Sequence, residues 1–272
     1  MTTTELIRVA LYEDMPSGDI TTDHLFTDEE SQAVMIAKED GIISGIDVAK
    51  ETFEIVDESI TVSILKANGS RVVKGDIIAT ISGKTSSILK AERVALNFLQ
   101  RLSGIATLTS RYVKETSGYS VKILDTRNTT PTLLFLEKRA VVDGGGVNHR
   151  FNLSDMVMIK DNHIKAAGSI TNAVKIIRKN VHHDVKVEVE VETITQLKEA
   201  LSTDTDIIML DNMSCDLMRE CVLINQHQKL LEASGNMTLE RIKEVSMTGV
   251  DFISVGALTH SYPSLDISLR FR

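Results

Sequence analysis

Short apolar runs that stop abruptly recur through the second half of the chain, and their spacing constrains the fold more than any other feature. The runs end at Asp125, Lys160, Glu190, Asp211, Glu232 and Val255, at intervals of 35, 30, 21, 21 and 23 residues. Each interval holds one strand, one helix and two short loops, so the pattern predicts repeated βα units built on a parallel sheet. Six or seven units in about 150 residues fit an α/β barrel that is open or incomplete, because eight units typically need a longer chain.

A doubly wound open sheet is the alternative architecture for the same repeat. It would place a ligand in a crevice between strand ends, whereas a barrel gathers every carboxyl strand end around one point. All but one of the run ends are ionisable, and a ring of such side chains at one mouth would build a binding site. We therefore favour the barrel.

The first part of the chain has a different pattern of apolar residues. Alternating or continuous apolar runs from Ala33 to Ile88, punctuated by glycines, predict a small sheet of short strands with one helix over Val48 to Val56. Helical spacing of apolar residues predicts a short amphipathic helix over Thr3 to Asp14 and a long buried helix over Lys90 to Thr116. We place the domain boundary inside the long helix, between residues 104 and 105.

Charge and composition limit the partners. The chain has 30 Lys and Arg against 38 Asp and Glu, a formal charge of −8, which argues against a nucleic-acid surface. No apolar run approaches the roughly 20 residues that span a bilayer, and the first residues turn acidic before a signal peptide could form. We predict a cytoplasmic protein with no membrane partner, in which an anionic ligand must meet a local cluster of cations.

The region from 125 to 163 holds such a cluster around the triplet Gly144, Gly145 and Gly146. Its basic residues are Arg127, Lys138, Arg139, His149, Arg150, Lys160 and His163. A flexible loop with a solvated basic face is one interpretation. The cations fall at or just after predicted strand ends, however, which favours anion binding.

Carboxylates and small residues mark the later strand ends. Glu188, Glu190 and Glu192 alternate along one face of a predicted strand, which in a barrel drives them into the lumen, where they need cations or a metal. Asp211 ends the next strand, within reach of the last of these carboxylates, and two carboxylates on neighbouring strand ends form a minimal holder for Mg²⁺ beside a phosphate-rich ligand. Small residues at the last two strand ends (Ser234, Gly235, Gly256 and Ala257) suit phosphate binding, with ordinary glycine turns as the alternative.

Nine motifs together resemble the type II quinolinate phosphoribosyltransferases, also called carboxylating nicotinate-nucleotide pyrophosphorylases. In chain order they are EDMPSGDITT, AERVALNFLQRLSGIAT, DTRNTTP, GGGVNHR, MIKDNHI, VEVEVE, IMLDNM, LEASGNM and VGALTHS. The resemblance implies an N-terminal α/β sandwich domain over 1–104, completed by about 262–272, and an incomplete α/β barrel over 105–261. It also implies a homodimer in which the sandwich domain of one subunit covers the barrel mouth of the other.

The implied reaction joins quinolinate to phosphoribosyl pyrophosphate (PRPP), with Mg²⁺, and yields nicotinate mononucleotide, pyrophosphate and CO₂. The resemblance implies that Glu190, Asp211 and Lys160 are catalytic and that Glu190 and Asp211 hold the metal. It implies that Arg93 reaches into the neighbouring subunit's site. Substrate contacts are implied for Arg127, Asn128, His149, Arg150 and Lys160, and contacts to the 5′-phosphate for Ser234, Gly235, Asn236, Gly256 and Ala257.

One segment departs from the family pattern, which has Lys where this chain has Asn128, Gly at Thr132 and Arg at Leu134. An Asn keeps hydrogen bonding but loses the charge, which weakens one contact to an anion. Three hypotheses about function follow: the chain is a working quinolinate enzyme, a paralogue with another acceptor, or a weakly active binding protein. The retained NHR, KDNHI and VEVEVE segments favour the first.

Two unrelated functions are also considered. A phosphosugar aldolase on the same barrel would use Lys160 as a Schiff-base former in a cation-poor setting. A biotinyl or lipoyl carrier is suggested by the hairpin-like stretch from Asn68 to Gly83, but Lys84 lacks the setting of a modified lysine, and we interpret this stretch as scaffold.

Overall fold

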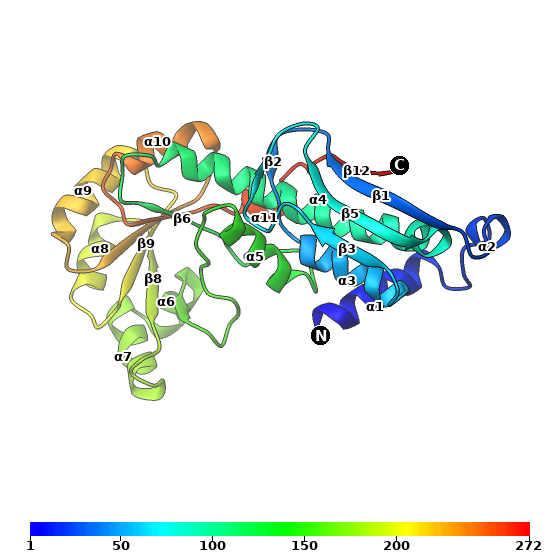
Figure 1. Cartoon of the computed structure of the whole chain (residues 1–272). Helices are drawn as coiled ribbons and strands as arrows, with labels where there is room; N and C mark the ends of the chain where they lie inside the picture. Colours follow the sequence, from blue (N-terminus) through cyan, green and yellow to red (C-terminus); the bar gives the residue numbers. More distant parts are fainter. The chain divides into compact units, whose positions relative to one another are not determined.

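The computed structural model describes all 272 residues and divides into two compact units (Figure 1). The first unit comprises residues 1–110, 131–145 and 262–272, and the second comprises 111–130 and 146–261. The boundary at residues 110 and 111 lies within one long helix, α4 (Thr85–Glu115). The sequence prediction also placed a boundary within this helix, at 104 and 105, but assigned residues 131–145 to the second domain.

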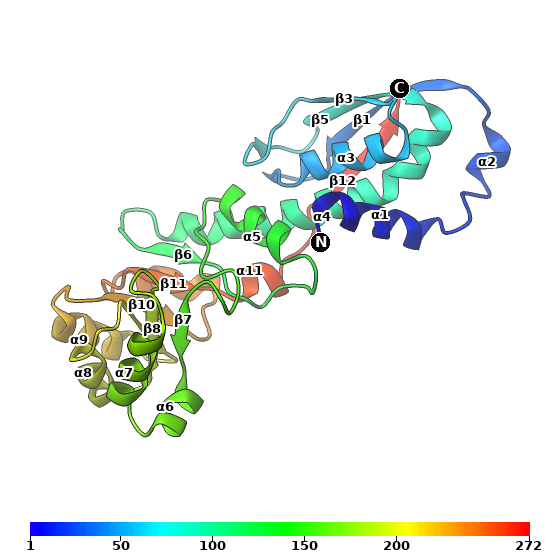
Figure 2. The ribbon, with the colours of Figure 1, turned by 90° about the horizontal axis from the view of Figure 1, so that it is seen from below.

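The first unit is built on a four-stranded antiparallel sheet. Its strands, in spatial order, are β12 (Ile267–Phe271), β1 (Glu30–Ala37), β5 (Ile77–Lys84) and β3 (Thr61–Ile64). Helices α1 (Thr3–Asp14), α3 (Ile46–Val56) and α4 lie alongside these strands (Figure 2). The remaining elements are α2 (Thr22–Leu25), α5 (Leu134–Asp143) and the small ribbon of β2 (Gly41–Ile42) and β4 (Arg71–Val72).

The core of the first unit lies between this sheet and its helices. Apolar side chains from β1, β5, α3 and α4 meet there, and Met35, Phe53, Ile78 and Leu99 are fully buried. β12 pairs with β1 from Ala33 opposite Phe271 to Ala37 opposite Ile267, so a segment that follows the second unit in the chain returns to the first. The expected N-terminal layered α/β domain is confirmed.

The second unit contains a six-stranded parallel sheet. Its strands, in spatial order, are β6 (Lys122–Leu124), β11 (Phe252–Ser254), β10 (Leu230–Ser234), β9 (Ile207–Asp211), β8 (Val187–Val191) and β7 (Val157–Ile159). Strand β6 comes first along the chain but pairs with β11, the last, as barrel closure requires. Consecutive strands β6 and β7 do not pair, so the barrel is incomplete, as predicted.

Helices alternate with these strands and lie outside the sheet (Figure 1). They are α6 (Asp161–Ala167), α7 (Ile170–Asn180), α8 (Ile194–Leu201), α9 (Cys215–Asn225), α10 (Leu239–Ser246) and α11 (Ala257–His260). The carboxyl ends of the parallel strands meet at one edge, where most of the predicted run ends lie. Asp211 is the last residue of β9, and Lys160 directly follows β7. No helix of the protein is long and apolar enough to cross a bilayer.

Thr132 has a left-handed backbone in an exposed loop of the first unit, with φ of 72°. A β-branched residue is strained there, because its Cβ crowds the backbone. We expect Thr132→Gly to raise the free energy of unfolding by about 1 kcal/mol, because relief of strain outweighs the added flexibility of the unfolded chain. Urea titration measures the change, with Thr132→Ala as the control that keeps the Cβ. A glycine variant no more stable than the alanine variant would contradict the prediction.

Candidate active site

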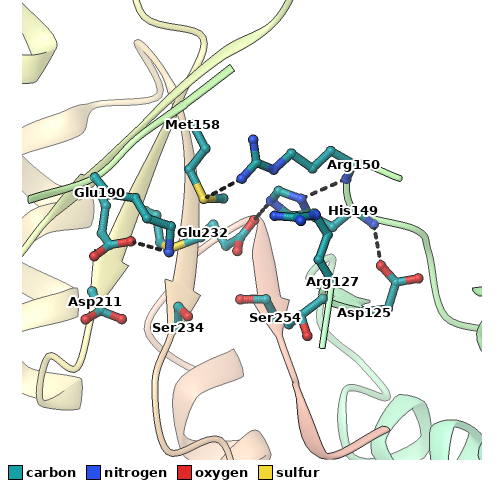
Figure 3. A pocket seen from close by; sticks show the side chains of 13 residues that line it. Asp125, Arg127, His149, Arg150, Met158, Glu190, Asp211, Glu232, Ser234 and Ser254 are labelled. Atoms are coloured by element: carbon teal, nitrogen blue, oxygen red, sulfur yellow. Dashed lines mark hydrogen bonds and ion pairs between the residues drawn. The ribbon is translucent and has the colours of Figure 1, made fainter. Parts of the chain in front are cut away.

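A cavity of about 300 Å³ opens among the carboxyl strand ends of the second unit (Figure 3). All the residues that line it belong to this unit. They are Asp125, Thr126, Arg127, His149, Arg150, Met158, Lys160, Glu190, Met209, Asp211, Glu232, Ser234 and Ser254. Cations from several loops therefore meet carboxylates from several strands at one point.

Two guanidinium groups lie on one side of this cavity. The Nη1 atom of Arg150 donates to the carbonyl of Met156 at 3.0 Å, which holds its side chain in place. Burial, followed by the nearby charge of Arg127, lowers the pKa of Arg150. Two guanidinium groups on one wall of a cavity suit the binding of an anion, because each can donate two parallel hydrogen bonds to a carboxylate or phosphate.

Asp125 positions the loop that carries His149 and Arg150. It follows β6, is completely buried, and accepts hydrogen bonds from Asn148 Nδ2 at 2.5 Å and from the backbone N–H of His149 at 2.9 Å. A charged acceptor with two N–H donors is a strong local anchor. The end of β6 thereby fixes the position of a segment more than twenty residues later in the chain.

His149 contacts two buried carboxylates, of which Glu232 also lines the cavity. Its Nε2 lies 2.9 Å from Glu188 Oε2 and 3.4 Å from Glu232 Oε2, and both glutamates are completely buried. Burial lowers the pKa of His149, but the hydrogen bonds and charges of Glu188 and Glu232 outweigh burial and raise it to about 10. Burial, aided by the charge of Glu232, raises the pKa of Glu188 to about 7.

The backbone N–H of Arg150 points at the other ring nitrogen, Nδ1 of His149, from 2.7 Å. This contact opposes a proton on Nδ1, whereas the raised pKa of His149 favours one. Whether or not Nδ1 carries a proton, Nε2 keeps its own proton and donates it to the glutamates. His149 is therefore held at both of its nitrogens.

At the opposite side of the cavity, Glu190 and Asp211 point inward (Figure 3). Glu190 Oε2 lies 3.2 Å from Lys160 Nζ, and Asp211 Oδ2 accepts a hydrogen bond from Asn212 Nδ2 at 2.7 Å. Two carboxylates on neighbouring strands offer the hard oxygen donors that Mg²⁺ prefers, with room for water and phosphate oxygens. The donor set fits the predicted metal.

A second cavity of about 610 Å³ adjoins the first and shares Thr126, Ser234 and Ser254 with it. It is lined by the loops after β10 and β11, including Gly235, Asn236, Gly256 and Ala257. A Cβ on Gly235, where φ is 90°, would lie 2.2 Å from Asn212 Oδ1, so only glycine fits there. Arg241 Nη1 braces the loop by donating to the carbonyl of Gly235 at 3.0 Å.

Comparison with known families accounts for nearly the whole chain. Residues 19–103 match the model of the quinolinate phosphoribosyl transferase N-terminal domain, and residues 105–270 match that of its C-terminal domain. The chain belongs to the quinolinate phosphoribosyltransferase family. The predicted resemblance is confirmed.

Individual members of the quinolinate phosphoribosyltransferase family are similar over their full length. The chain is 44% identical over 265 residues to a probable carboxylating nicotinate-nucleotide pyrophosphorylase of Bacillus subtilis, covering 97% of this chain and 92% of that protein. The solved nicotinate-nucleotide pyrophosphorylase of Francisella tularensis superposes with a TM-score of 0.97 at 41% identity, covering 99% of this chain and 96% of that one. NadC from Streptococcus pyogenes gives a TM-score of 0.95 at 40% identity, covering 98% and 96%.

The structure brings most of the predicted site residues together in the two cavities. The first cavity is lined by Arg127, His149, Arg150, Lys160, Glu190, Asp211 and Ser234, and the second by Ser234, Gly235, Asn236, Gly256 and Ala257. Two predicted residues line neither cavity. Arg93 is exposed on α4 in the first unit, and Asn128 is exposed in the loop after Arg127, where its carbonyl accepts a hydrogen bond from Thr259 Oγ1 at 2.7 Å.

Sequence reasoning assigned no role to several polar residues of the site. Glu188, Glu232 and Ser254 are buried there, and the Oγ atom of Ser254 has no hydrogen-bond partner. Their signal was the two-residue period of a strand, since Glu188 precedes Glu190 by two positions and Glu232 precedes Ser234 by two. That period points Glu188 and Glu232 into the barrel lumen, two residues before the side chains of Glu190 and Ser234 at the mouth.

Proposed function

We propose that this chain transfers the phosphoribosyl group of PRPP to quinolinate with loss of CO₂, giving nicotinate mononucleotide and pyrophosphate for NAD biosynthesis. Its membership of the quinolinate phosphoribosyltransferase family supports this activity. The observation that carries it is one cavity in which Arg127, Arg150, His149 and Lys160 face Glu190 and Asp211. Cations suit the two carboxylates of the acceptor, and the adjoining glycine-containing loops suit a phosphate.

The reaction needs charge stabilisation more than a covalent intermediate on the protein. The pyridine nitrogen attacks C1 of the ribose as the bond to pyrophosphate breaks, and positive charge develops on the sugar. Glu190 and Asp211 are suited to stabilise that charge. Once ribosylated, the pyridinium nitrogen draws the electron pair of the departing carboxylate, CO₂ leaves, and the ring carbon takes a proton. When bound, Mg²⁺ would be held by Glu190 and Asp211 and would neutralise phosphate charge.

The charge balance of the cavity supports a homodimer as part of this proposal. Arg127, Arg150, Lys160 and His149 are matched in number by the carboxylates Asp125, Glu190, Asp211 and Glu232. The cavity of one chain is therefore close to neutral, whereas quinolinate and PRPP bring several negative charges. We propose that Mg²⁺ and Arg93 of a second subunit supply the missing positive charge, because the side chain of Arg93 is exposed.

Exposed apolar side chains support the same assembly. Within residues 9–25, Val9 is 57% exposed, Tyr12 70%, Ile20 80% and Leu25 67%. Such a concentration of large apolar side chains is typical of a surface that another protein covers. The proposed partners are a second copy of this chain and two small anions, and the cytoplasm remains the predicted compartment.

Incubation with quinolinate, PRPP and Mg²⁺ tests the activity. Nicotinate mononucleotide and CO₂ should appear in equal amounts, and nicotinate offered as a competing acceptor should yield little product. Turnover of nicotinate in preference to quinolinate would indicate a paralogue with another acceptor. Borohydride trapping of a sugar phosphate on Lys160 would indicate an aldolase, although Lys160 Nζ is already engaged in an ion pair with Glu190.

The Asn128→Lys variant tests the departure from the family pattern. An added cation beside Arg127 should lower KM for quinolinate, or raise kcat, about three- to tenfold, the effect being limited by solvent because position 128 is exposed. Steady-state kinetics with each substrate varied in turn measures it, and Asn128→Gln is the neutral control. A harmful lysine would point to a pocket shaped for a different acceptor.

A further inference from the structure

Two buried carboxylates are not assigned a step in the proposed reaction: Glu232, which lines the first cavity, and Glu188 beside it. Glu188 on β8 and Glu232 on β10 are completely buried, and apart from their contacts with Nε2 of His149 their oxygens have no hydrogen-bond partner. Oxygens of both side chains and Nε2 of His149 all lie within 4.8 Å of one another. Burial of polar groups with so few partners destabilises a fold. If these two positions served only to pack the protein interior, apolar side chains would be expected there.

Both carboxylates face the same nitrogen. Glu188 lies 2.9 Å and Glu232 3.4 Å from Nε2 of His149, whose side chain is only 7% exposed. Nδ1 of the same ring receives the backbone N–H of Arg150, and the backbone N–H of His149 donates to Asp125. The ring therefore ties the buried pair to the backbone from which Arg150 projects into the cavity.

We propose that Glu188 and Glu232 are positioning residues, which fix His149 and the adjoining Arg150 in the orientation that receives the acid acceptor. The inference rests on the proposed function, because it assigns the acceptor to the His149 side of the cavity. The two glutamates act through His149, and Glu190 and Asp211 act on the sugar at the opposite side (Figure 3). The destabilisation of the fold by the buried pair is then offset by better binding of one substrate only, quinolinate.

Kinetics and stability together distinguish this role from a structural one. Glu188→Leu should raise KM for quinolinate at least tenfold, leave KM for PRPP within twofold, and leave Tm unchanged or higher, because a buried charge is removed. Glu188→Gln should recover most of the loss, because its amide oxygen still accepts from Nε2. Glu192→Gln, an exposed change just beyond the same strand, is the matched control and should behave as wild type.

Three results would overturn the proposal. In the first, Glu188→Leu lowers Tm while the kinetics of the folded protein stay unchanged. In the second, both KM values rise equally. In the third, the glutamine variant binds quinolinate as poorly as the leucine variant.

Nitrogen-15 NMR of the histidine rings gives a readout that needs no turnover. The chain has 7 histidines, and His149→Gln identifies the resonance of His149 by its loss. We expect the proton on Nε2 of His149 to exchange slowly with water in the wild type and rapidly in Glu188→Leu. Equal exchange in both would refute positioning. Slow exchange in a wild-type protein that makes no nicotinate mononucleotide would instead refute the proposed function alone.

The same spectra test whether the cluster is a metal site. Under the positioning proposal, Mn²⁺ should affect His149 only through the site at Glu190 and Asp211, so Asp211→Asn should abolish any broadening. Broadening that survives Asp211→Asn and disappears in Glu188→Gln would assign a cation to the buried cluster, and the positioning role would be rejected.

Discussion

Mixing equal amounts of an Arg93→Ala chain and an Asp211→Ala chain should restore about a quarter of the wild-type kcat, because half of the proposed homodimers would be mixed and each of these would have one intact site. Each variant alone should retain about a hundredth to a thousandth of the activity, because each lacks one charge at the reacting groups. The expectation follows from Arg93 lying exposed in the first unit, while Asp211 lines the cavity of the second.

A reciprocal mixture provides the control. A chain that carries both substitutions, mixed equally with wild type, should lower the activity per wild-type chain by about half, because neither site of a mixed dimer is complete. The subunits are exchanged by co-expression with two tags. Mixed dimers purified through both tags should show about half of the wild-type kcat for the single variants and almost no activity for the reciprocal pair. If the mixture of single variants remained as inactive as its components, each site would be completed within one chain, and the proposed role of Arg93 would be wrong.

Replacement of Glu190 by Gln should lower kcat by about two to three orders of magnitude, with a smaller change in KM for quinolinate. The glutamine keeps the size of the side chain but removes the charge that pairs with Lys160 Nζ at 3.2 Å and that would stabilise the developing positive sugar. Rapid-quench measurement of a single turnover separates this chemical step from product release.

Glu192 provides the comparison for this substitution. It follows β8 by one residue and is exposed, and its backbone N–H donates to Gln196 Oε1 at 2.8 Å, outside the lining of the cavity. Glu192→Gln should therefore keep kcat within about twofold of wild type, as is usual for exposed positions. Equal losses at positions 190 and 192 would mean that overall negative charge, not placement, governs the rate.

The barrel and much of its mouth could be predicted from the sequence because parallel strands impose a simple rule. Every such strand ends at the same edge of the sheet, so residues that stop successive apolar runs come together in space. Lys160, Glu190 and Asp211 were found in this way. The two-residue period of β8 also indicated which of its side chains face the lumen.

Contacts between distant segments could not be predicted in the same way. Nothing local in the sequence indicates that His149 rests on Glu188 and Glu232, because that contact depends on the stagger of three strands. The assignment of residues 131–145 to the first unit could not be predicted either, because it also depends on contacts between distant segments. Arg139 Nη1 meets Asp47 Oδ2 at 2.7 Å, and Ser44 Oγ donates to Asp143 at 2.6 Å, across gaps of about a hundred residues.

The pairing of β12 with β1 has a consequence for biosynthesis. Residues 33–37 meet residues 267–271, so the first unit lacks its outer strand until the ribosome has made all of the second. We expect the barrel to fold early, while the edge of β1 that pairs with β12 stays exposed. Nascent chains with an exposed strand edge recruit chaperones or aggregate. Slow translation through the barrel would prolong that exposure, so synthesis speed should affect the yield of this protein more than its final stability.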